Sequence, residues 1–559
     1  MVGRLLNLLS KEIGGLHEAA FLLAASAFLS QLLALFRDRL LAYTFGAGQM
    51  LDVYYGAFRI PDLIYVSIAS FVSVTVLIPF IIEGLNRGDH KGVKDFVDEL
   101  FTLFTLVMIV VSVGAFVALP LLTPYLVPGF TPAQQLQLVL LARIMLLSPF
   151  LLGLSNLLGS VTQGLHKFFV YALSPICYNL GIILGVIFLY PLFGLSGLAW
   201  GVGLGALMHL SVQLPALSRA GFFPTPRLPR QWIKIKEVII ISLPRTITLG
   251  ANQMALLALL SLASTLSVGA IAVFNFAWNL QSVPLAIVGV SYSVAAFPTL
   301  SKMFAQGEME EFLNHIRTAF RHIAFWSIAA TVFFVVLRAQ VVRVILGSGH
   351  FGWTETRLVA AALALFAISV TAQSLVLLFV RGYYAAGRTQ VPFWTNTLSS
   401  VLIVALAYGL HYGFQVWPFG RYFLEALFRV VDLPGTSVLV LPLAFSLGLL
   451  VNLGVLLFIF RLDFGGLGRV AWRAARQSLT ASIFGGFVAY QILNLLALKL
   501  NLDTFKGIFL QGLLGGLGGL GATYVLLLVM KNQEVKELTT TLHHKFWRAR
   551  PFAPEPEEL

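Results

Sequence analysis

Charged residues and cysteine are scarce in this chain of 559 residues. Only 11% of the residues are charged and 58% are hydrophobic, whereas a soluble domain carries about 25% charged residues. The one cysteine, Cys177, cannot form an intrachain disulfide or a Cys-x-x-Cys metal site. The sequence has no His-Glu-x-x-His motif, Walker loop or nucleophile elbow. We therefore predict that the chain is neither a soluble domain nor an enzyme, and that it needs no cofactor or metal.

Long apolar runs dominate what is present. A helix needs about 20 apolar residues to cross a bilayer, and runs of that length recur along the whole chain. The pattern predicts an all-α polytopic membrane protein with about 14 transmembrane helices. The spans are expected near 19–45, 52–83, 98–122, 133–164, 170–190, 194–218, 237–266, 269–303, 312–337, 357–387, 391–412, 436–460, 476–498 and 507–530.

The formal net charge of +13 comes mostly from short loops between these spans. Basic residues concentrate on one side, for example in the segment 219–236, and this bias marks the cytoplasmic side of a membrane protein. The opposite loops hold Arg338, Arg343, Arg357, Arg421, Arg429, Lys499 and Lys506. We therefore place both termini in the cytoplasm and predict no nucleic-acid partner.

An internal repeat relates two groups of six spans. Pro79 and Gly88 at the end of the second span match Pro298 and Gly307 at the end of the eighth. Each residue of the second pair lies 219 positions after its match in the first. Because six is an even number, both copies enter the membrane in the same direction, as in transporters with parallel repeats. The predicted parts are an N-lobe (1–218), a basic cytoplasmic linker (219–236), a C-lobe (237–460), two extra helices (461–531) and a cytoplasmic tail (532–559).

Ionisable residues gather in the first two spans. Arg37-Asp38-Arg39 interrupts the first, and Asp52, Tyr55, Arg59 and Asp62 share one face of the second because they are spaced 3, 4 and 3 apart. Arg37 and Arg59 should lie about 12 Å and 10 Å from the outer end, at about 1.5 Å per residue. Charges inside a bilayer are costly, so they usually mark a polar cavity or a transport path.

Two interpretations of this cluster stay open. The charges can neutralise one another in structural ion pairs, or the excess of arginine can form a positively charged cavity that binds phosphate groups. Arg245 in the seventh span is a further candidate, which either lines a cavity or reaches the cytoplasmic surface. His209 in the sixth span is more simply a packed histidine than a proton relay. The candidate cavity residues are Arg37, Asp38, Asp52, Arg59, Arg39, Asp62 and Arg245.

Several motifs together resemble one family. They are Phe36-Arg37-Asp38, Phe45-Gly46-Ala47-Gly48, Asp52, Ala57-Phe58-Arg59-Ile60-Pro61, Pro79, Ser174-Pro175, Asn179, Pro298-Thr299-Leu300-Ser301, Gly349-His350-Phe351, Gly382-Tyr383-Tyr384-Ala385 and Pro392. On these residues the chain resembles the MurJ (MviN) lipid II flippases, which belong to the multidrug/oligosaccharidyl-lipid/polysaccharide exporter superfamily. The similarity covers about residues 19 to 530 and agrees with the predicted spans.

The resemblance implies two six-helix lobes around a central cationic cavity in the inner membrane of a bacterium. It also implies that the protein flips an undecaprenyl-pyrophosphate-linked peptidoglycan precursor by alternating access. Arg37, Asp38, Asp52 and Arg59 match polar residues of the family's cavity. The implied partners are this lipid-linked pyrophosphate glycan and the bilayer, and we expect a monomer.

The chain departs from the family pattern at charged positions. Gln31 and Asn279 stand where the family usually has arginines, and Tyr65-Val66 and Ala69-Ser70 replace arginines and a Glu-Gly pair. Three other hypotheses therefore stay open: a flippase for another lipid-linked oligosaccharide, a small-molecule antiporter of the same superfamily, and a membrane scaffold that transports nothing.

Overall fold

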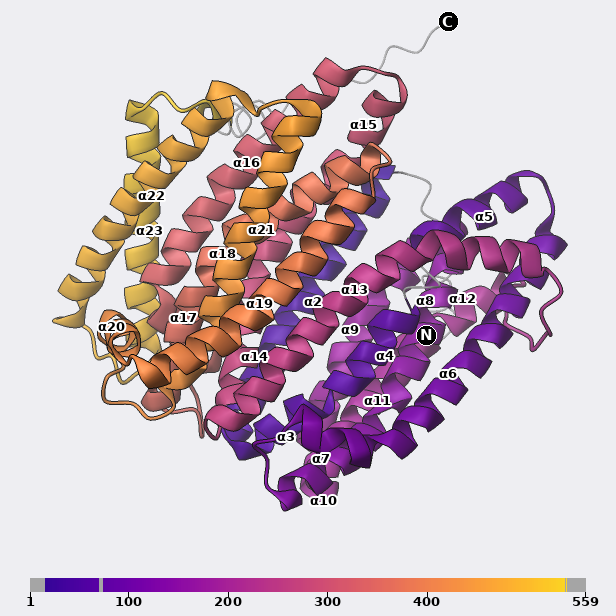
Figure 1. The fold of residues 1–559 in the computed structure, drawn as a ribbon, viewed down its shortest axis with the longest axis horizontal. Helices are drawn as coiled ribbons and strands as arrows, with labels where there is room; N and C mark the ends of the chain where they lie inside the picture. The colour runs from indigo at the N-terminus through magenta and orange to yellow at the C-terminus, as the bar shows by residue number, and fades with distance from the viewer. Residues whose placement is uncertain (1–15, 70–73, 538, 540–559) are drawn as a thin grey trace, which may run out of the picture. The chain divides into compact units, whose positions relative to one another are not determined.

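A computed structural model describes residues 16–69, 74–537 and 539. Within these residues every regular element is a helix, because a chain in lipid must satisfy its backbone hydrogen bonds internally. The described residues pack as two units (Figure 1). The first comprises those of Met1–Leu280, Ile345–Ala362 and Phe393–Gly448, and the second those of Gln281–Val344, Leu363–Pro392 and Leu449–Leu559.

Fifteen of the described helical elements lie wholly within the first unit, most of them in the N-terminal part of the chain. They are α2 (Leu16–Phe45), α3 (Gln49–Ala57), α4 (Arg59–Ala69), α5 (Val74–Asn86), α6 (His90–Leu126), α7 (Pro132–Met145), α8 (Leu147–Gly164), α9 (Phe168–Leu184), the π-helix η1 (Gly185–Leu189), α10 (Tyr190–Phe193), α11 (Leu195–Ser211), α12 (Leu214–Arg219), α13 (Trp232–Leu266), α20 (Phe419–Phe428) and the 3₁₀ turn η3 (Thr436–Leu439).

The second unit holds the π-helix η2 (Leu285–Val290), α15 (Ser291–Ala305), α16 (Met309–Val336), α22 (Gly468–Ala497) and α23 (Phe505–Val529). Five helices run from one unit into the other: α14 (Ala270–Pro284), α17 (Arg338–Leu346), α18 (Trp353–Ala385), α19 (Gln390–Val416) and α21 (Val440–Phe464). The units reflect packing, whereas the predicted lobes rest on the repeat, so the lobe boundaries stay a prediction.

The predicted all-α membrane architecture is confirmed. Among the described residues, twelve helices are long and apolar enough to cross a membrane, and they coincide with the third to fourteenth predicted spans. The first predicted span corresponds to α2. The second is divided into α3, α4 and α5, and residues 70–73 within it lie outside the described part.

Buried aromatic residues form the core of the second unit. Phe320 on α16, Phe379 on α18 and Phe460 on α21 are each at most 1% exposed, and the Phe379 and Phe460 rings lie 4.9 Å apart. Helices α22 and α23 run side by side along this unit (Figure 1). Gly519 of α23 faces Ala489 and Gly485 of α22 so closely that a Cβ there would lie 2.7 Å from each. Small residues let helices approach closely in lipid.

The basic linker is hydrogen-bonded to the first turns of α6. Between α12 and α13, the backbone N–H of Thr225 donates to Asp98 Oδ1 at 3.1 Å, and the N–H groups of Arg230 and Gln231 donate to Glu99 Oε2 at 2.9 and 2.8 Å. The Asp98 and Glu99 side chains are buried. Helix α13 already begins at Trp232, so the predicted linker 219–236 includes its first residues.

The start of the tail packs against α16 in the second unit. Arg321 lies 2.9 Å from Glu534 and 3.4 Å from Glu537. Val535 is 1% exposed and packs with Ala481 and Leu527. The predicted cytoplasmic tail therefore begins as an attached segment, while residues 538 and 540–559 lie outside the described part.

Candidate functional site

Arg37 is held from two sides in the first unit. Its Nε and Nη2 donate to Asp38 Oδ1 at 3.0 and 2.8 Å, and its Nη1 donates to Asn179 Oδ1 at 3.1 Å. Asn179 in turn donates to Ser30 Oγ at 3.2 Å, which ties α9 to α2. The guanidinium orientation is therefore fixed by an acid on its own helix and an amide on the neighbouring helix.

Asp38 is buried and shared between two partners. Its side chain is 3% exposed, and its Oδ2 accepts a hydrogen bond from Asn279 Nδ2 of α14 at 2.9 Å. Arg37 and Asp38 form an ion pair, as one of the two open interpretations allows, and the other oxygen of Asp38 is bonded to a neutral amide. The cluster thus carries a pair of opposite charges and two amides.

Arg59 occupies the first position of α4, directly after the break at Phe58. Its Nη2 donates to Asn275 Oδ1 of α14 at 2.7 Å, and Asn275 donates to the Ile271 carbonyl oxygen at 2.7 Å. Its buried Nε has no hydrogen-bond partner among the residues that the structure describes. A guanidinium with an unused buried donor has capacity to bind a further anionic oxygen.

Tyr55 connects the two arginines. It interacts electrostatically with Arg37, Asp38 and Arg59, and its ring packs edge-on against Phe276 of α14 at 5.9 Å. Its buried hydroxyl, like Arg59 Nε, lacks a partner within the described part of the chain. Arg37, Tyr55 and Arg59 therefore form one polar cluster.

Asp52 has a different geometry from these residues. It is 3% exposed, and its carboxylate accepts hydrogen bonds from the backbone N–H groups of Gly269 at 2.5 Å and Ala272 at 2.9 Å. These groups belong to the start of α14, so Asp52 caps that helix. Gly269 has φ +85°, and a Cβ there would lie 2.2 Å from the Ala47 carbonyl oxygen, so only glycine permits this close approach.

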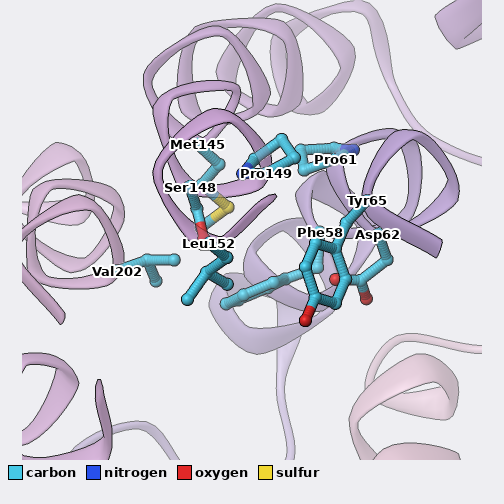
Figure 2. Close-up of a pocket in the computed structure, with 9 residues that line it drawn as sticks. All are labelled: Phe58, Pro61, Asp62, Tyr65, Met145, Ser148, Pro149, Leu152 and Val202. Carbon is cyan, nitrogen blue, oxygen red and sulfur yellow. The ribbon is translucent and has the colours of Figure 1, made fainter. Parts of the chain in front are cut away.

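The remaining candidates make no hydrogen bond to this cluster that the structure describes, although Asp62 interacts electrostatically with Arg59. Arg39 Nη1 donates to the Ile345 carbonyl oxygen at 3.4 Å. Asp62 faces a pocket together with Tyr65, Ser148 and six apolar side chains (Figure 2). Arg245 lies within α13, but its side chain is outside the described part, so the structure does not test its role.

His209 is bonded, as its interpretation as a packed histidine predicts. Its Nδ1 lies 2.7 Å from Ser155 Oγ, and Gln213 Nε2 donates to the same hydroxyl at 2.5 Å. The network joins α8 to α11 inside the first unit. Among residues 16–69, 74–537 and 539, no three His, Cys, Asp or Glu side chains lie close enough to hold a metal ion.

Sequence reasoning missed the amides that orient the arginines. Asn275 has no place in the predicted site, Asn179 appeared only as part of a motif, and Asn279 only as a departure from the family. A signal was available, because asparagine inside an apolar span is itself unusual and tends to bond between helices. The partner of each amide could not be identified without the fold.

An all-helical fold with many candidate membrane spans and ionisable residues held inside it is typical of a membrane transport protein. A family model described as "Lipid II flippase MurJ" matches residues 41–508. The chain therefore belongs to the lipid II flippase MurJ family.

Relatives and solved structures agree with this assignment. The chain is 28% identical over 389 residues to a probable lipid II flippase MurJ of Rhizobium tropici, covering 68% of this chain and 72% of the relative. It is 26% identical over 385 residues to the lipid II flippase MurJ of Burkholderia cenocepacia, covering 67% and 75%.

The fold is similar to that of a lipid II flippase MurJ in an inward closed conformation, with a TM-score of 0.71, 19% identity, and coverage of 91% of this chain and 99% of that one. An inward-facing multidrug resistance MATE transporter of the MOP superfamily shares the fold with a TM-score of 0.62, 16% identity, and coverage of 78% and 95%. These likenesses show that the chain shares its fold with both transporters.

Proposed function

We propose that this chain translocates a polyprenyl-pyrophosphate-linked peptidoglycan precursor, lipid II, from the cytoplasmic to the outer leaflet by alternating access. The observation that carries the proposal is the cluster of Arg37, Tyr55 and Arg59, in which Asn179 and Asn275 orient the guanidiniums. Family membership supplies the class of cargo.

The chemistry of the cluster suits a pyrophosphate. Phosphate oxygens accept paired hydrogen bonds from guanidinium groups, which are planar and permanently charged. Arg59 Nε and the Tyr55 hydroxyl are buried donors with no partner among the described residues, so binding a phosphate would satisfy both. The polyprenyl tail would stay in the bilayer while the headgroup moves.

We further infer the setting of this activity. The protein acts in the bacterial inner membrane with both termini in the cytoplasm, as a monomer, without a nucleic-acid partner and without catalysing a reaction. Its lobes are 1–218 and 237–460, joined by the linker 219–236 and followed by 461–531 and the tail 532–559. The membrane potential can assist transport, since moving one charge across 100 mV is worth about 2.3 kcal/mol.

A second candidate is a flippase for another polyprenyl-linked oligosaccharide. It is favoured by Asn279, a neutral amide that faces Asp38 at 2.9 Å in place of the arginine typical of the family. A cluster with fewer positive charges would bind a headgroup of lower charge about as readily as it binds a pyrophosphate. The two candidates share the fold and the translocation step and differ only in cargo.

Complementation tests the proposal. The chain is expressed in a bacterium whose own MurJ can be depleted, and rescue of growth is scored at equal membrane expression. Wild-type chain should rescue, and Arg37→Lys or Arg59→Lys should rescue poorly because lysine keeps the charge and loses the paired geometry. Arg87→Lys is the control, since Arg87 pairs with Glu83 on an exposed surface. Failure of the wild-type chain to rescue contradicts the lipid II assignment.

A further inference from the structure

A pocket in the first unit lies beside the arginine cluster, and the proposed function does not use it. Its interior is small, with about 10 Å³ of space open to a molecule the size of water. Asp62, Tyr65 and Phe58 approach it from the region of α4, Ser148 and Leu152 from α8, and Val202 from α11 (Figure 2). Met145 at the end of α7 completes the lining, so the pocket lies between four helices of one packed unit.

Asp62 is the one acidic residue among the side chains that line this pocket. Apart from Asp62, the polar lining consists of the Tyr65 and Ser148 hydroxyls. Tyr65 already accepts a hydrogen bond from Asn156 Nδ2 at 2.6 Å. The carboxyl group is thus placed in an apolar pocket with an opening, which is a setting for reversible exchange of a small ligand.

The lining decides which ligand fits. Hard metal cations are held by about six or more oxygen atoms, whereas this pocket offers one carboxylate and two hydroxyls. A phosphate or other anion would be repelled by the carboxylate. A proton needs only the carboxyl oxygen itself, so it is the ligand that this lining accepts.

Arg59 makes this site sensitive to the neighbouring cluster. It lies one turn before Asp62 on α4, and its charge interacts with the Asp62 carboxyl. Among the described side chains, Tyr65 on α4 and Tyr178 on α9 also interact with Asp62. The pocket-lining residues from α7, α8 and α11 carry no charge. Helix α13 also packs against α4 and carries Arg245, whose side chain lies outside the described part. Among the described side chains, Arg59 is therefore the charged neighbour that can favour the carboxylate form.

We propose that the Asp62 carboxyl takes up one proton when a pyrophosphate binds Arg59, and returns it when the pyrophosphate leaves. A bound phosphate neutralises the positive charge that favours the carboxylate, while the apolar pocket continues to favour the neutral acid. The proton comes from solution and binds a carboxyl oxygen without any other bond changing. This inference rests on the proposed function, because it requires a phosphate group at Arg59.

Linkage makes the effect reciprocal. If pyrophosphate binding promotes proton uptake, a proton on Asp62 must promote pyrophosphate binding by the same factor. The affinity should therefore rise as the pH falls, by up to about tenfold per pH unit in the range where Asp62 titrates with one proton per site. Transport would then carry a proton together with the cargo's headgroup.

The test uses the full chain purified in detergent, with undecaprenyl pyrophosphate as the probe. Binding is followed by fluorescence of the nine tryptophans, and proton uptake by an indicator dye in weakly buffered solution. Wild-type chain should absorb up to one proton more per bound probe than Asp62→Asn does, which corrects for protons exchanged by the pyrophosphate itself. Asp62→Asn should still bind, with a flatter pH profile.

Two further variants separate this role from a structural one. Asp62→Glu should restore proton uptake, because it retains a titratable carboxyl. Glu83→Gln should behave as wild type, since Glu83 lies in an exposed pair with Arg87. Equal proton uptake by the wild-type chain and Asp62→Asn, with the probe bound in both, overturns the proton site alone. Absence of probe binding by the wild-type chain overturns the proposed function and this inference with it.

Discussion

Asn279 of α14 donates a hydrogen bond to Asp38 Oδ2 at 2.9 Å, on the side of the carboxylate opposite Arg37. Asp38 thereby joins α2 to α14, helices that begin 254 residues apart in the sequence. The carboxylate has one positive partner and one neutral partner, and it is buried from solvent. Its contribution to stability should therefore exceed that of a surface charge.

The first prediction concerns this carboxylate. Asp38→Ala leaves a guanidinium without its charged partner, and removing one member of a buried ion pair costs about 3 to 5 kcal/mol. Thermal unfolding in detergent should therefore occur at a clearly lower temperature. Glu83→Ala is the control, because the exposed Glu83–Arg87 pair should contribute at most about 1 kcal/mol. Equal unfolding temperatures for both variants would contradict a structural role for Asp38.

The second prediction tests whether Asp52 only caps a helix or also lines the cavity. Asp52→Ala removes both acceptors at the start of α14 and should cost about 0.5 to 2 kcal/mol, whereas Asp52→Ser keeps one acceptor and should cost less. Thermal unfolding measures the cost, and complementation measures function. A fully stable Asp52→Ser variant that fails to complement would show that the carboxylate serves the cargo as well as the helix.

The hydrogen bonds between the linker and α6 predict that the linker resists proteolysis. The backbone of residues 225–231 is bonded to α6 through Asp98 and Glu99, so trypsin should cleave slowly after Arg227 and Arg230. The double variant Asp98→Ala/Glu99→Ala releases this backbone and should be cleaved there many times faster. Mass spectrometry of the fragments identifies the sites. Asp89→Ala, which alters only the exposed cap of α6, should leave the cleavage rate unchanged.

Asp432 gives a pH-dependent contribution to stability. It lies in the loop after α20, where Arg357 Nη1 donates to its Oδ2 at 2.7 Å and lowers the pKa of its carboxyl. Because the folded-state pKa is depressed, the stabilisation is present above the ordinary aspartate pKa of about 3.9 and is lost as the pH falls through the folded value. The difference in unfolding temperature between wild type and Asp432→Asn should be small, constant near neutral pH, and absent in strong acid.

The membrane architecture could be predicted from sequence because long continuous apolar runs cross a bilayer as helices. Each run of about 20 apolar residues must be a helix, since lipid offers no hydrogen-bond partner. The break between α3 and α4 was missed, although Pro61 carries a signal for it: proline favours the first turn of a helix and lacks the N–H that an interior position would use. Hydropathy alone merges such helices into one span.

The site could be predicted only in part. Helical spacing placed Arg37, Tyr55 and Arg59 in one region, because those residues lie in the first two predicted spans. The partners of Asp52 could not be predicted, since Gly269 and Ala272 lie more than 200 residues further along the chain and depend on how α3 packs against α14. The same holds for Asn275 and Asn279, whose significance depends on which side chain each one meets.

The final prediction restores the charge that the family pattern implies at Asn279. Asn279→Arg would bring a second guanidinium to the side of Asp38 that Asn279 occupies, raising the positive charge of the cluster by one. A charge-assisted hydrogen bond to a phosphate contributes about 1.5 to 3 kcal/mol, and each 1.4 kcal/mol changes an affinity about tenfold. Undecaprenyl pyrophosphate should therefore bind at least about tenfold more tightly to Asn279→Arg than to wild type. Asn279→Gln, which keeps the amide and adds length, should show no such gain. An affinity unchanged in both variants would mean that the cargo's phosphates do not approach Asp38, and would confine phosphate binding to the Arg59 side of the cluster.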